Sequence, residues 1–136
     1  MQIIKCGEQD IPQLAAMNKR LIEDEKSDNP MNISELENRM KDFLETEYDA
    51  YFFRDGDDIA GYALVKRNCS PPYLRQFFIE RDFRQKHLGT TAFRTLLDYL
   101  KTDSLDIEVL TRNETGIKFW EKLGFEEISR YMRYKK

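Results

Sequence analysis

The sequence predicts an α/β (α+β) protein, with one mixed, mostly antiparallel central sheet and helices on both faces, in the order βααβββαβαβ(β). Two observations support this fold class. Apolar residues recur at helical spacing in four stretches, and short runs rich in β-branched and aromatic residues separate them. The 136 residues contain no internal repeat and no low-complexity linker. We therefore expect a single domain over residues 1–136.

The N-terminal part should form a short strand at residues 3–4 and two helices. Asp10 and Pro12 begin the first helix, because aspartate caps helix starts and proline loses no hydrogen bond in a first turn. Asn32 followed by Glu35 is a capping-box pattern and begins the second helix. Their apolar stripes are Ile11, Leu14, Met17 and Leu21, and then Ile33, Leu36, Met40, Phe43 and Leu44.

The middle of the chain predicts the sheet. Residues 48–53 and 59–66 flank the turn at residues 55–58, which indicates a hairpin. The prolines at 71–72 end that pattern, since proline donates no ladder hydrogen bond. Residues 73–79 then supply the central strand.

The last part alternates helix and strand. A helical stripe begins after residue 87 and contains Leu88, Ala92, Phe93, Leu96, Leu97 and Leu100. Residues 105–110 predict a strand, and residues 115–123 predict a helix that Gly124 closes. Residues 125–134 predict a terminal strand pair or bent ribbon.

A basic turn joins the central strand to the helix after residue 87. A helix start presents backbone N–H groups without intrahelical partners and a partial positive charge. Arg84 and Lys86 lie beside it, with the hydroxyls of Thr90 and Thr91 within reach. Gly89 has no Cβ and lets an anion approach the backbone. These features predict a cradle for a diphosphate.

Composition narrows the class of protein. Apolar residues make up 40% and charged residues 35%, and no apolar run reaches 18 residues, so we expect a soluble protein that acts without a membrane. No secretory signal is visible, which makes the cytoplasm the expected compartment. Cys6 and Cys69 have no metal-ligand spacing, and we expect no metal. The net charge of −3 and the lack of a recognition motif argue against nucleic acid as a partner.

Two motifs carry a family resemblance. Residues 84–89, RQKHLG, resemble the Arg/Gln-x-x-Gly-x-Gly/Ala pyrophosphate loop of the GNAT superfamily of N-acetyltransferases, with His87 at the first glycine position. Residues 113–125, NETGIKFWEKLGF, resemble the later Asn-x-x-Ala-x-x-x-Tyr-x-x-x-Gly-Phe motif, with Trp120 at the tyrosine position. The resemblance covers about residues 72–126.

The resemblance implies acetyl-CoA as co-substrate and a set of cofactor-binding residues. The loop would hold the diphosphate mostly through backbone amides, and main-chain N–H groups around residues 78–79 would bind the thioester oxygen. Asn113 would touch the pantetheine arm and could also cap the helix at 115–123. Phe119 and Trp120 would flank the cofactor or pack on the sheet. The full set is Phe78, Ile79, Arg84, Gln85, Lys86, His87, Leu88, Gly89, Thr90, Asn113, Phe119 and Trp120.

His87 is the only histidine in the chain, which invites a catalytic role. No partner for a metal site or a triad is visible, and this favours a solvent-facing loop residue. A left-handed backbone at this position would be strained for any residue other than glycine.

The catalytic groups are less defined. An indole cannot deliver a proton, so either the thiolate leaves unaided, at a pKa of about 8 to 9, or Tyr131 or Tyr134 acts as the acid. The base candidates are Gln76, through a bound water, and Glu108. The alternatives are a hydrogen-bonded sheet amide for Gln76, a solvated face for Glu108 and packing for the tyrosines.

Residues 21–60 carry 13 acidic and 4 basic side chains, whereas the rest of the chain is net basic. This asymmetry suggests a cationic acceptor, with Glu23 and Glu25 as its binding residues, or else solvated helix faces. We expect an acetyl-CoA-dependent N-acetyltransferase that acts on a primary amine, a small cation or a peptide, by direct attack in a ternary complex. The alternative is an acyl-CoA-binding sensor or interaction module that has lost turnover. The terminal ribbon or the hairpin edge could form a homodimer.

Overall fold

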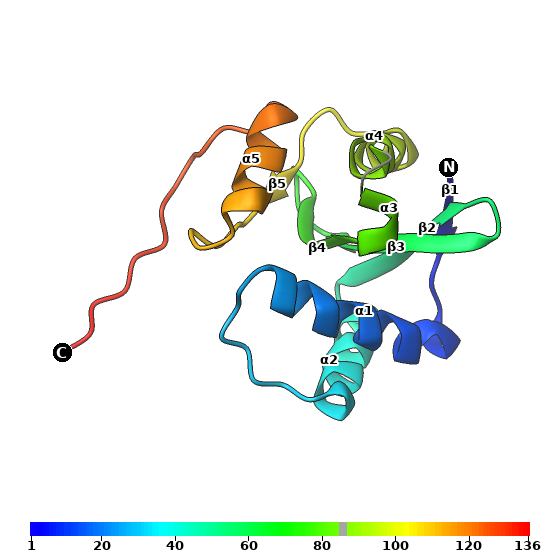
Figure 1. The fold of residues 1–136 in the computed structure, drawn as a ribbon, viewed down its shortest axis with the longest axis horizontal. Coiled ribbons are helices and arrows are strands. Elements are labelled where there is room, and N and C mark those ends of the chain that lie inside the picture. Colours follow the sequence, from blue (N-terminus) through cyan, green and yellow to red (C-terminus); the bar gives the residue numbers. More distant parts are fainter. Residues whose placement is uncertain (85–86) are drawn as a thin grey trace.

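The structure is a computed structural model that describes residues 1–84 and 87–136. The elements follow the predicted order closely (Figure 1). They are β1 (Gln2–Lys5), the 3₁₀ turn η1 (Glu8–Asp10), α1 (Ile11–Asp24), α2 (Ile33–Glu45), β2 (Tyr48–Asp55), β3 (Asp58–Lys66), β4 (Tyr73–Ile79), α3 (Arg81–Arg84), α4 (Leu88–Leu100), β5 (Asp106–Ile107) and α5 (Glu114–Lys122).

In the part of the chain that the structure describes, five strands form one sheet in the order β1-β2-β3-β4-β5. The pairs from β1 to β4 are antiparallel, and β5 runs parallel to β4. Helices α1 and α2 lie on one face, and α3 and α4 lie on the other (Figure 1). The predicted fold class is confirmed.

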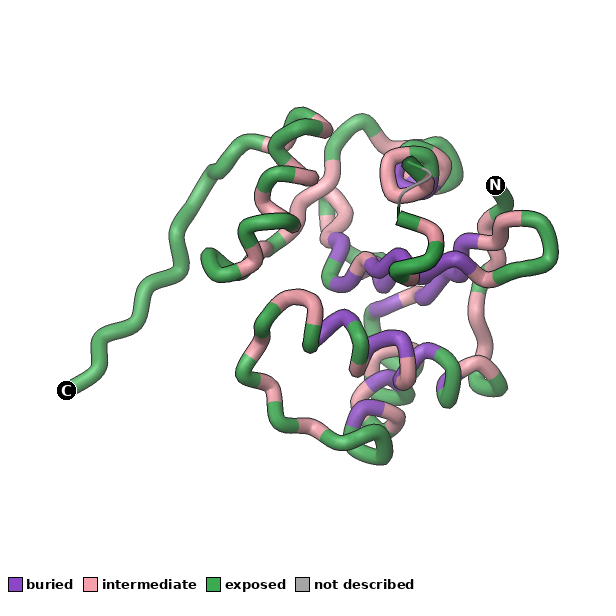
Figure 2. Tube along the Cα trace, in the orientation of Figure 1, coloured by how far each residue is buried: buried purple, intermediate pink, exposed green. Residues whose placement is uncertain are grey.

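The central strands are buried on both faces, so the sheet separates two apolar cores (Figure 2). The core under α1 and α2 includes Leu14, Met17, Met40, Phe52, Tyr62 and Phe78. The core under α4 includes Phe53, Ala63, Leu74, Ile79, Ala92 and Leu96.

Local signals in the sequence fix the helix starts. The side chain of Asn32 accepts a hydrogen bond from the Glu35 N–H at 2.9 Å, and the Glu35 carboxylate accepts one from the Asn32 N–H at 3.0 Å. The predicted capping box is therefore formed. Asp10 precedes α1 as predicted, but its carboxylate accepts from the Gly7 N–H at 2.9 Å instead of capping the first turn of α1.

Strands β3 and β4 approach each other closely at Gly61. A Cβ placed on this residue would lie 1.9 Å from the carbonyl oxygen of Phe78, which is far inside any normal contact. Glycine is therefore required here for β4 to pair fully with β3.

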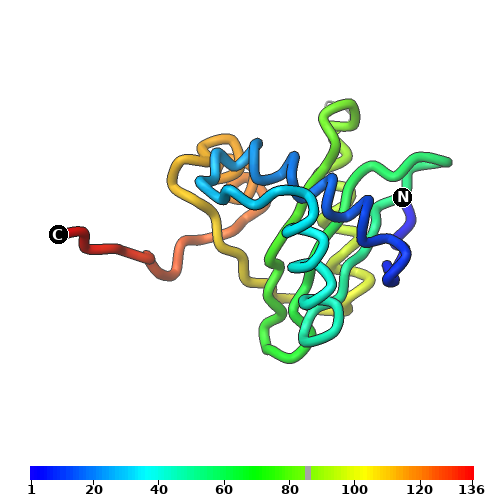
Figure 3. Tube along the Cα trace, turned by 90° about the horizontal axis from the view of Figure 1, so that it is seen from below, coloured from blue at the N-terminus to red at the C-terminus, as the bar shows by residue number. Residues whose placement is uncertain are grey.

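The predicted terminal strand pair or ribbon over residues 125–134 is wrong. Residues 126–136 form no strand, are exposed throughout, and lead away from the body of the molecule (Figures 1 to 3). The alternating pattern of a strand is present, but a strand also needs a neighbouring edge to pair with, and sequence pattern alone does not supply one. Strand β5 is likewise shorter than predicted, at two residues.

Candidate functional site

The site is built where β4 and β5 part. The two strands pair only at Tyr73 with Asp106 and at Leu74 with Ile107, although β4 continues to Ile79. Along residues 75–79 the described strands therefore pair with β4 on the β3 side alone. The other side of β4 therefore has no described strand along these residues, although the carbonyl of Ile79 accepts a hydrogen bond from Arg84 Nε.

The start of α4, which follows β4 after α3, is where the sequence predicts the anion site. Its first intrahelical bond runs from the Thr91 N–H to the His87 carbonyl, and no side chain of the described residues caps the helix. The N–H groups of Leu88, Gly89 and Thr90 therefore have no acceptor within the helix. The 13 residues of α4 add the positive end of a helix dipole.

His87 adopts the left-handed conformation that was predicted to be strained, with φ 57° and ψ 23°. Its side chain is exposed, which agrees with a solvent-facing loop residue. Gln85 and Lys86, both predicted cofactor-binding residues, lie outside the described residues.

Arg84 ends the short helix α3, which the sequence did not predict. Its Nε donates to the carbonyl of Ile79 at 2.8 Å, and its guanidinium lies 5.6 Å from the ring of Phe78. Arg84 also pairs with Asp24 from α1, and Asp24 accepts a second hydrogen bond from Arg81 at 3.0 Å. The arginine is therefore placed at the end of β4 but is held by a carboxylate.

A cluster of aromatic rings lies between α4, α5 and β4. Trp120 packs edge-on to Phe77, Phe93 and Phe125, with ring centroids 5.3, 5.7 and 5.1 Å apart. Phe119 stacks on Phe77 at 6.1 Å. Of the two predicted roles for Phe119 and Trp120, the structure shows the packing role.

Gly89 faces this cluster. A Cβ on Gly89 would lie 3.2 Å from the Phe119 ring, a tight contact. The glycine therefore allows α5 to approach α4, in addition to leaving the backbone open. Asn113 caps α5, since its Oδ1 accepts from the Gly116 N–H at 3.0 Å, as the sequence allowed.

Gln76 belongs to a buried polar chain on the α1 face of the sheet. The hydroxyl of Tyr62 donates to its Oε1 at 2.7 Å, and Asn18 in turn bonds to Tyr62. Arg39 donates to Asn18 at 2.9 Å. Burial raises the pKa of Tyr62, so the phenol stays protonated. The Gln76 side chain is thus a hydrogen-bonded sheet amide, the alternative that the sequence left open.

The other three catalytic candidates, Glu108, Tyr131 and Tyr134, are exposed. Glu108 is exposed just after β5 and shares a hydrogen bond with Tyr73, whose pKa is raised first by burial and then by that carboxylate. Tyr131 is 88% exposed on the tail, and Tyr134 is 87% exposed. The structure does not bring the tail tyrosines to the end of β4.

The two predicted acceptor-binding residues at the end of α1, Glu23 and Glu25, lie in different environments. Glu23 is exposed, whereas Glu25 is half-buried. Burial, followed by the charge of Asp24, raises the pKa of Glu25 to about 6. This carboxyl group therefore titrates close to neutral pH.

The segment after α1 is also anchored at two points that sequence analysis missed. Asp24 binds Arg81 and Arg84 near the end of β4, and Asp28 accepts two hydrogen bonds from Arg112, at 3.0 and 3.1 Å, just before Asn113. We call residues 24–28 the acidic bridge. The only sequence signal for these ion pairs is that residues 24–28 are acidic whereas Arg81, Arg84 and Arg112 are basic. The partners are 57 to 84 positions apart along the chain.

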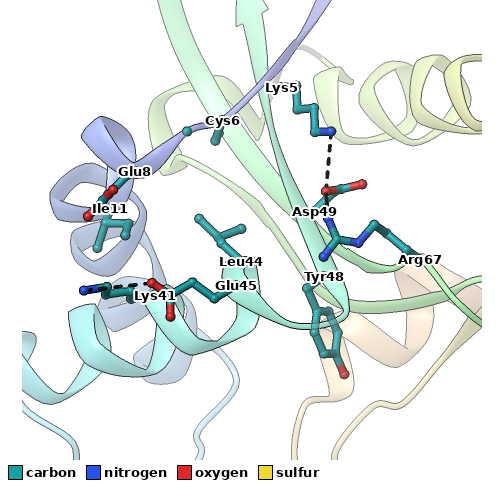
Figure 4. A pocket seen from close by; sticks show the side chains of 11 residues that line it. Lys5, Cys6, Glu8, Ile11, Lys41, Leu44, Glu45, Tyr48, Asp49 and Arg67 are labelled. Atoms are coloured by element: carbon teal, nitrogen blue, oxygen red, sulfur yellow. Dashed lines mark hydrogen bonds and ion pairs between the residues drawn. The ribbon is translucent and has the colours of Figure 1, made fainter.

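A hollow of about 250 Å³ lies at the other end of the sheet, where β1 ends and β2 begins (Figure 4). Most of its charged residues are paired: Asp49 with Lys5 at 3.6 Å and with Arg67 at 2.7 Å, and Lys41 with Glu45 at 3.9 Å. The lining includes Cys6, and burial raises the pKa of this thiol to about 12. None of the predicted site residues lines this hollow.

A second hollow, of about 380 Å³, lies beside the end of β4 on the α1 side. It is lined by Arg20 of α1, by Asp57 and Asp58 at the hairpin tip, and by residues 80–83. Among the described residues, no helix is long and apolar enough to cross a membrane.

Comparison with curated proteins identifies relatives named as acetyltransferases. The chain is 25% identical over 85 residues to the N-alpha-acetyltransferase RimI of Mycobacterium tuberculosis, covering 60% of this chain and 54% of the relative. It is 28% identical over 65 residues to N-alpha-acetyltransferase 30 of Dictyostelium discoideum, covering 46% and 35%. An uncharacterized protein of Mycobacterium leprae is 30% identical over 96 residues, covering 67% and 27%. The chain thus spans between a quarter and about half of the length of these relatives.

Solved structures share the fold. An aminoglycoside N-acetyltransferase in complex with CoA has a TM-score of 0.76 at 16% identity, covering 99% of this chain and 93% of that one. An acetyltransferase from Clostridium acetobutylicum with acetyl-CoA has a TM-score of 0.74 at 15% identity, covering 98% and 95%.

The family model described as the acetyltransferase (GNAT) family matches residues 16–125, which include β4, the start of α4 and the segment from Asn113 to Phe125. This match spans most of the chain and confirms the resemblance seen in the two motifs. The chain belongs to the acetyltransferase (GNAT) family.

Proposed function

We propose that the protein is an acetyl-CoA-dependent N-acetyltransferase that transfers the acetyl group to a primary amine by direct attack in a ternary complex. The observation that carries this proposal is the first turn of α4, which no described side chain caps and where a Cβ on Gly89 would lie 3.9 Å from Ile79 Cγ1 at the end of β4. Relatives named as N-alpha-acetyltransferases and neighbours solved with CoA or acetyl-CoA support it.

The residues present fit the cofactor. The diphosphate would accept hydrogen bonds from the N–H groups of Leu88, Gly89 and Thr90, with Arg84 adding charge. Main-chain N–H groups around Phe78 and Ile79, at the end of β4, would donate to the thioester oxygen. Asn113 stands at the start of α5 and would reach the pantetheine arm. When bound, acetyl-CoA supplies an activated carbonyl carbon.

The acceptor amine would approach along the acidic bridge. Glu23, Asp24, Glu25 and Asp28 attract a protonated amine, but the amine must lose a proton before its nitrogen attacks. Attack by the neutral amine would form a C–N bond as the C–S bond breaks, with the electron pair leaving on the sulfur. The second proton lost by the nitrogen would pass to a base group and, directly or through solvent, to the thiolate. We retain Gln76, through a bound water, and Glu108 as proposed base groups. We retain Tyr131 as a proposed acid, which requires the tail to move because the Tyr131 side chain is 88% exposed.

Binding of the cofactor is tested first. Isothermal titration of acetyl-CoA should show binding that weakens as salt rises, and Arg84→Ala should weaken it further. Arg94→Ala is the matched control, because Arg94 is an exposed arginine on α4 beyond its first turn. The absence of any heat of binding, or an equal effect of the two substitutions on affinity, would refute the proposed diphosphate site at the start of α4.

Turnover is tested by the release of free thiol from acetyl-CoA across a panel of amines, including diamines, aminoglycosides and peptides with free N-termini. The proposal expects release that depends on the amine. A second candidate function is a cofactor-binding module without turnover, which the departures at His87 and Trp120 favour. Tight cofactor binding without amine-dependent thiol release would support that second function. We expect either form to act in the cytoplasm.

A further inference from the structure

Two arginines on the α1 and α2 face of the sheet, Arg39 of α2 and Arg75 of β4, form no ion pair with the described residues. Arg39 donates to the amide oxygen of Asn18 at 2.9 Å, and its Nε is buried without an acceptor in the part of the chain that the structure describes. Arg75 is exposed and donates to the hydroxyl of Tyr48 at 3.4 Å. We call Arg39 and Arg75 the arginine pair. The described carboxylates leave its charge uncompensated, and burying such charge is costly.

Both guanidinium groups lie near one aromatic ring. The Cζ atom of Arg39 is 5.5 Å from the centroid of the Phe43 ring, and that of Arg75 is 4.9 Å from the same centroid. Two cations held this close repel each other. The pKa of Arg39 is accordingly lowered, first by burial and then by the charge of Arg75. An anion bound beside the arginine pair would offset both the burial and the repulsion.

The backbone of β4 explains how Arg75 reaches this face. In the pairing of β3 with β4, Leu64 lies opposite Gln76 and Val65 lies opposite Leu74. Arg75 is thus the extra residue of a β-bulge. A bulge interrupts the strict alternation of side chains along a strand. Arg75 therefore contacts α2 on the same face as the buried amide of Gln76.

Negative charge lies at the other end of the same face. The buried hydroxyl of Tyr62 responds to both signs: its pKa is raised by burial and then by the charge of Glu25, whereas the charge of Arg39 acts to lower it. Glu25 directly follows Asp24, which pairs with Arg84 at the end of β4. The face therefore has a negative end beside the proposed thioester position and a positive end nearer the start of β4.

The separation of the two ends limits the length of a ligand that reaches both. Four residues of β4 lead from Arg75 to Ile79, a rise of about 13 Å. A carboxylate–guanidinium hydrogen bond and the gap between an attacking nitrogen and its carbonyl carbon take up about 3 Å each. An α-amino acid is too short for the remaining distance, whereas a chain of several methylene groups spans it.

We propose that the acceptor carries a carboxylate several carbons from its amino group, that the arginine pair binds this carboxylate, and that the ammonium end lies toward Glu25. This inference rests on the proposed function and narrows the acceptor from primary amines in general to ω-amino carboxylates. Arginine suits the role, because its planar fork of N–H donors matches the two oxygens of a carboxylate. A polyamine or an aminoglycoside is cationic throughout, and the arginine pair would repel it.

Binding is tested without turnover by nitrogen-15 NMR of the arginine side chains of the full chain, with and without CoA. The buried Nε–H of Arg39 should exchange slowly with water, which makes it the reporter. Addition of 6-aminohexanoate should shift this signal, whereas hexylamine, the same chain without a carboxylate, should not.

The shift should be lost in Arg75→Gln, a change of an exposed side chain that leaves the core intact. Arg94→Gln is the matched control and should keep the shift, because Arg94 is exposed on α4 at the other face of the sheet (Figure 1). No shift with 6-aminohexanoate, or an equal shift with hexylamine, would overturn the assignment of the arginine pair as a carboxylate site.

Turnover tests the acceptor class through the release of free thiol from acetyl-CoA. The kcat/KM for 6-aminohexanoate should exceed that for hexylamine by about tenfold or more, the range of one hydrogen bond to a charged group. Arg75→Gln should abolish this preference by lowering only the value for 6-aminohexanoate, and Arg75→Lys should restore part of it.

The outcomes separate this inference from the proposed function. Equal release with hexylamine and 6-aminohexanoate would refute the inference and leave the proposed function standing. Release with neither these nor any other amine would refute the proposed function, and the NMR shift would then decide by itself whether the arginine pair binds a carboxylate.

Discussion

The backbone at His87 is where the chain departs most clearly from its family motif. The position has a positive φ, which glycine adopts freely and other residues adopt at a cost of about 1–2 kcal/mol. The expected strain followed from the motif, since histidine stands where the family has glycine. The structure adds that this residue directly precedes the open donors of α4. Strain and the candidate anion site thus meet at one peptide.

His87→Gly should therefore stabilise the protein by about 0.5–1 kcal/mol, because relief of strain exceeds the entropy that glycine adds to the unfolded chain. Urea unfolding followed by circular dichroism measures this difference. His87→Ala keeps a Cβ at the same φ and serves as the control, with no gain expected. A loss of stability in the glycine variant would show that the imidazole makes contacts that outweigh the strain.

Glu25 should make stability depend on pH. The folded chain holds the Glu25 proton up to about pH 6, whereas the unfolded chain releases it near pH 4.5. Ionisation of Glu25 thus opposes folding, and wild-type stability falls as pH rises from about 4.5 to 6. At pH 7.5, Glu25→Gln should be more stable than wild type by about 1 kcal/mol, discounted for partial exposure.

Thermal unfolding of both proteins between pH 4 and pH 8 measures the effect. The gap should close at low pH, where the carboxyl group is protonated in both states. Glu23→Gln is the matched control, since Glu23 is exposed and lies two residues earlier. A gap that is constant across the range would locate the effect in packing instead of ionisation.

Residues with local roles could be predicted from the sequence. Asn32, Glu35 and Asn113 satisfy backbone groups within three positions, so the pattern contains both partners. The partners of Gln76 and Arg84 could not be predicted. Tyr62 and Asp24 lie 14 and 60 positions away, and only the folded sheet brings them together.

At the scale of elements, the acidic bridge connects α1 to α3 and to the segment before α5. Asp24 forms an ion pair with the guanidinium of Arg84, the group that is proposed to bind the diphosphate. Cofactor binding must then compete with a carboxylate for Arg84. The ion pair with Asp24 holds the Arg84 side chain in place, but it lowers the affinity of this site for anions.

Asp24→Asn should consequently raise the affinity for CoA by about twofold to fivefold, the range expected for one partly exposed ion pair. Asp28→Asn is the control, because Asp28 pairs with Arg112 and leaves Arg84 unchanged. Titration calorimetry at low salt measures both. Weaker binding in the Asp24 variant would mean that the carboxylate orients Arg84 for the ligand.

Elements with a strong local pattern were predicted well, and elements that depend on distant pairing were not. The helices α1, α2 and α4 carry regular apolar stripes, and the hairpin of β2 and β3 has its turn signal at Gly56. The helix α3 has only four residues, too few to show a period. The tail has a strand pattern without a strand, because its pairing partner is not set by its own residues.

At the scale of the whole molecule, two cores share a single sheet. Side chains of β2, β3 and β4 alternate between the two cores, so neither core keeps its shape when the sheet separates. We propose that residues 1–136 form a single cooperative domain.

Unfolding by urea should then follow one transition. Fluorescence of Trp120, the only tryptophan, reports the α4 side, and far-ultraviolet circular dichroism reports all elements. The two midpoints should coincide. Separate midpoints would indicate that α4 and α5 unfold independently of α1 and α2.

The contact between Gly61 and the carbonyl of Phe78 constrains how this chain can vary. Any side chain at position 61 would push β3 away from β4 at the level where the thioester is proposed to bind. In a library that samples all amino acids at each codon, position 61 should tolerate fewer substitutions than any other position of the β2–β3 hairpin. Variants that survive with another residue there should revert to glycine under selection.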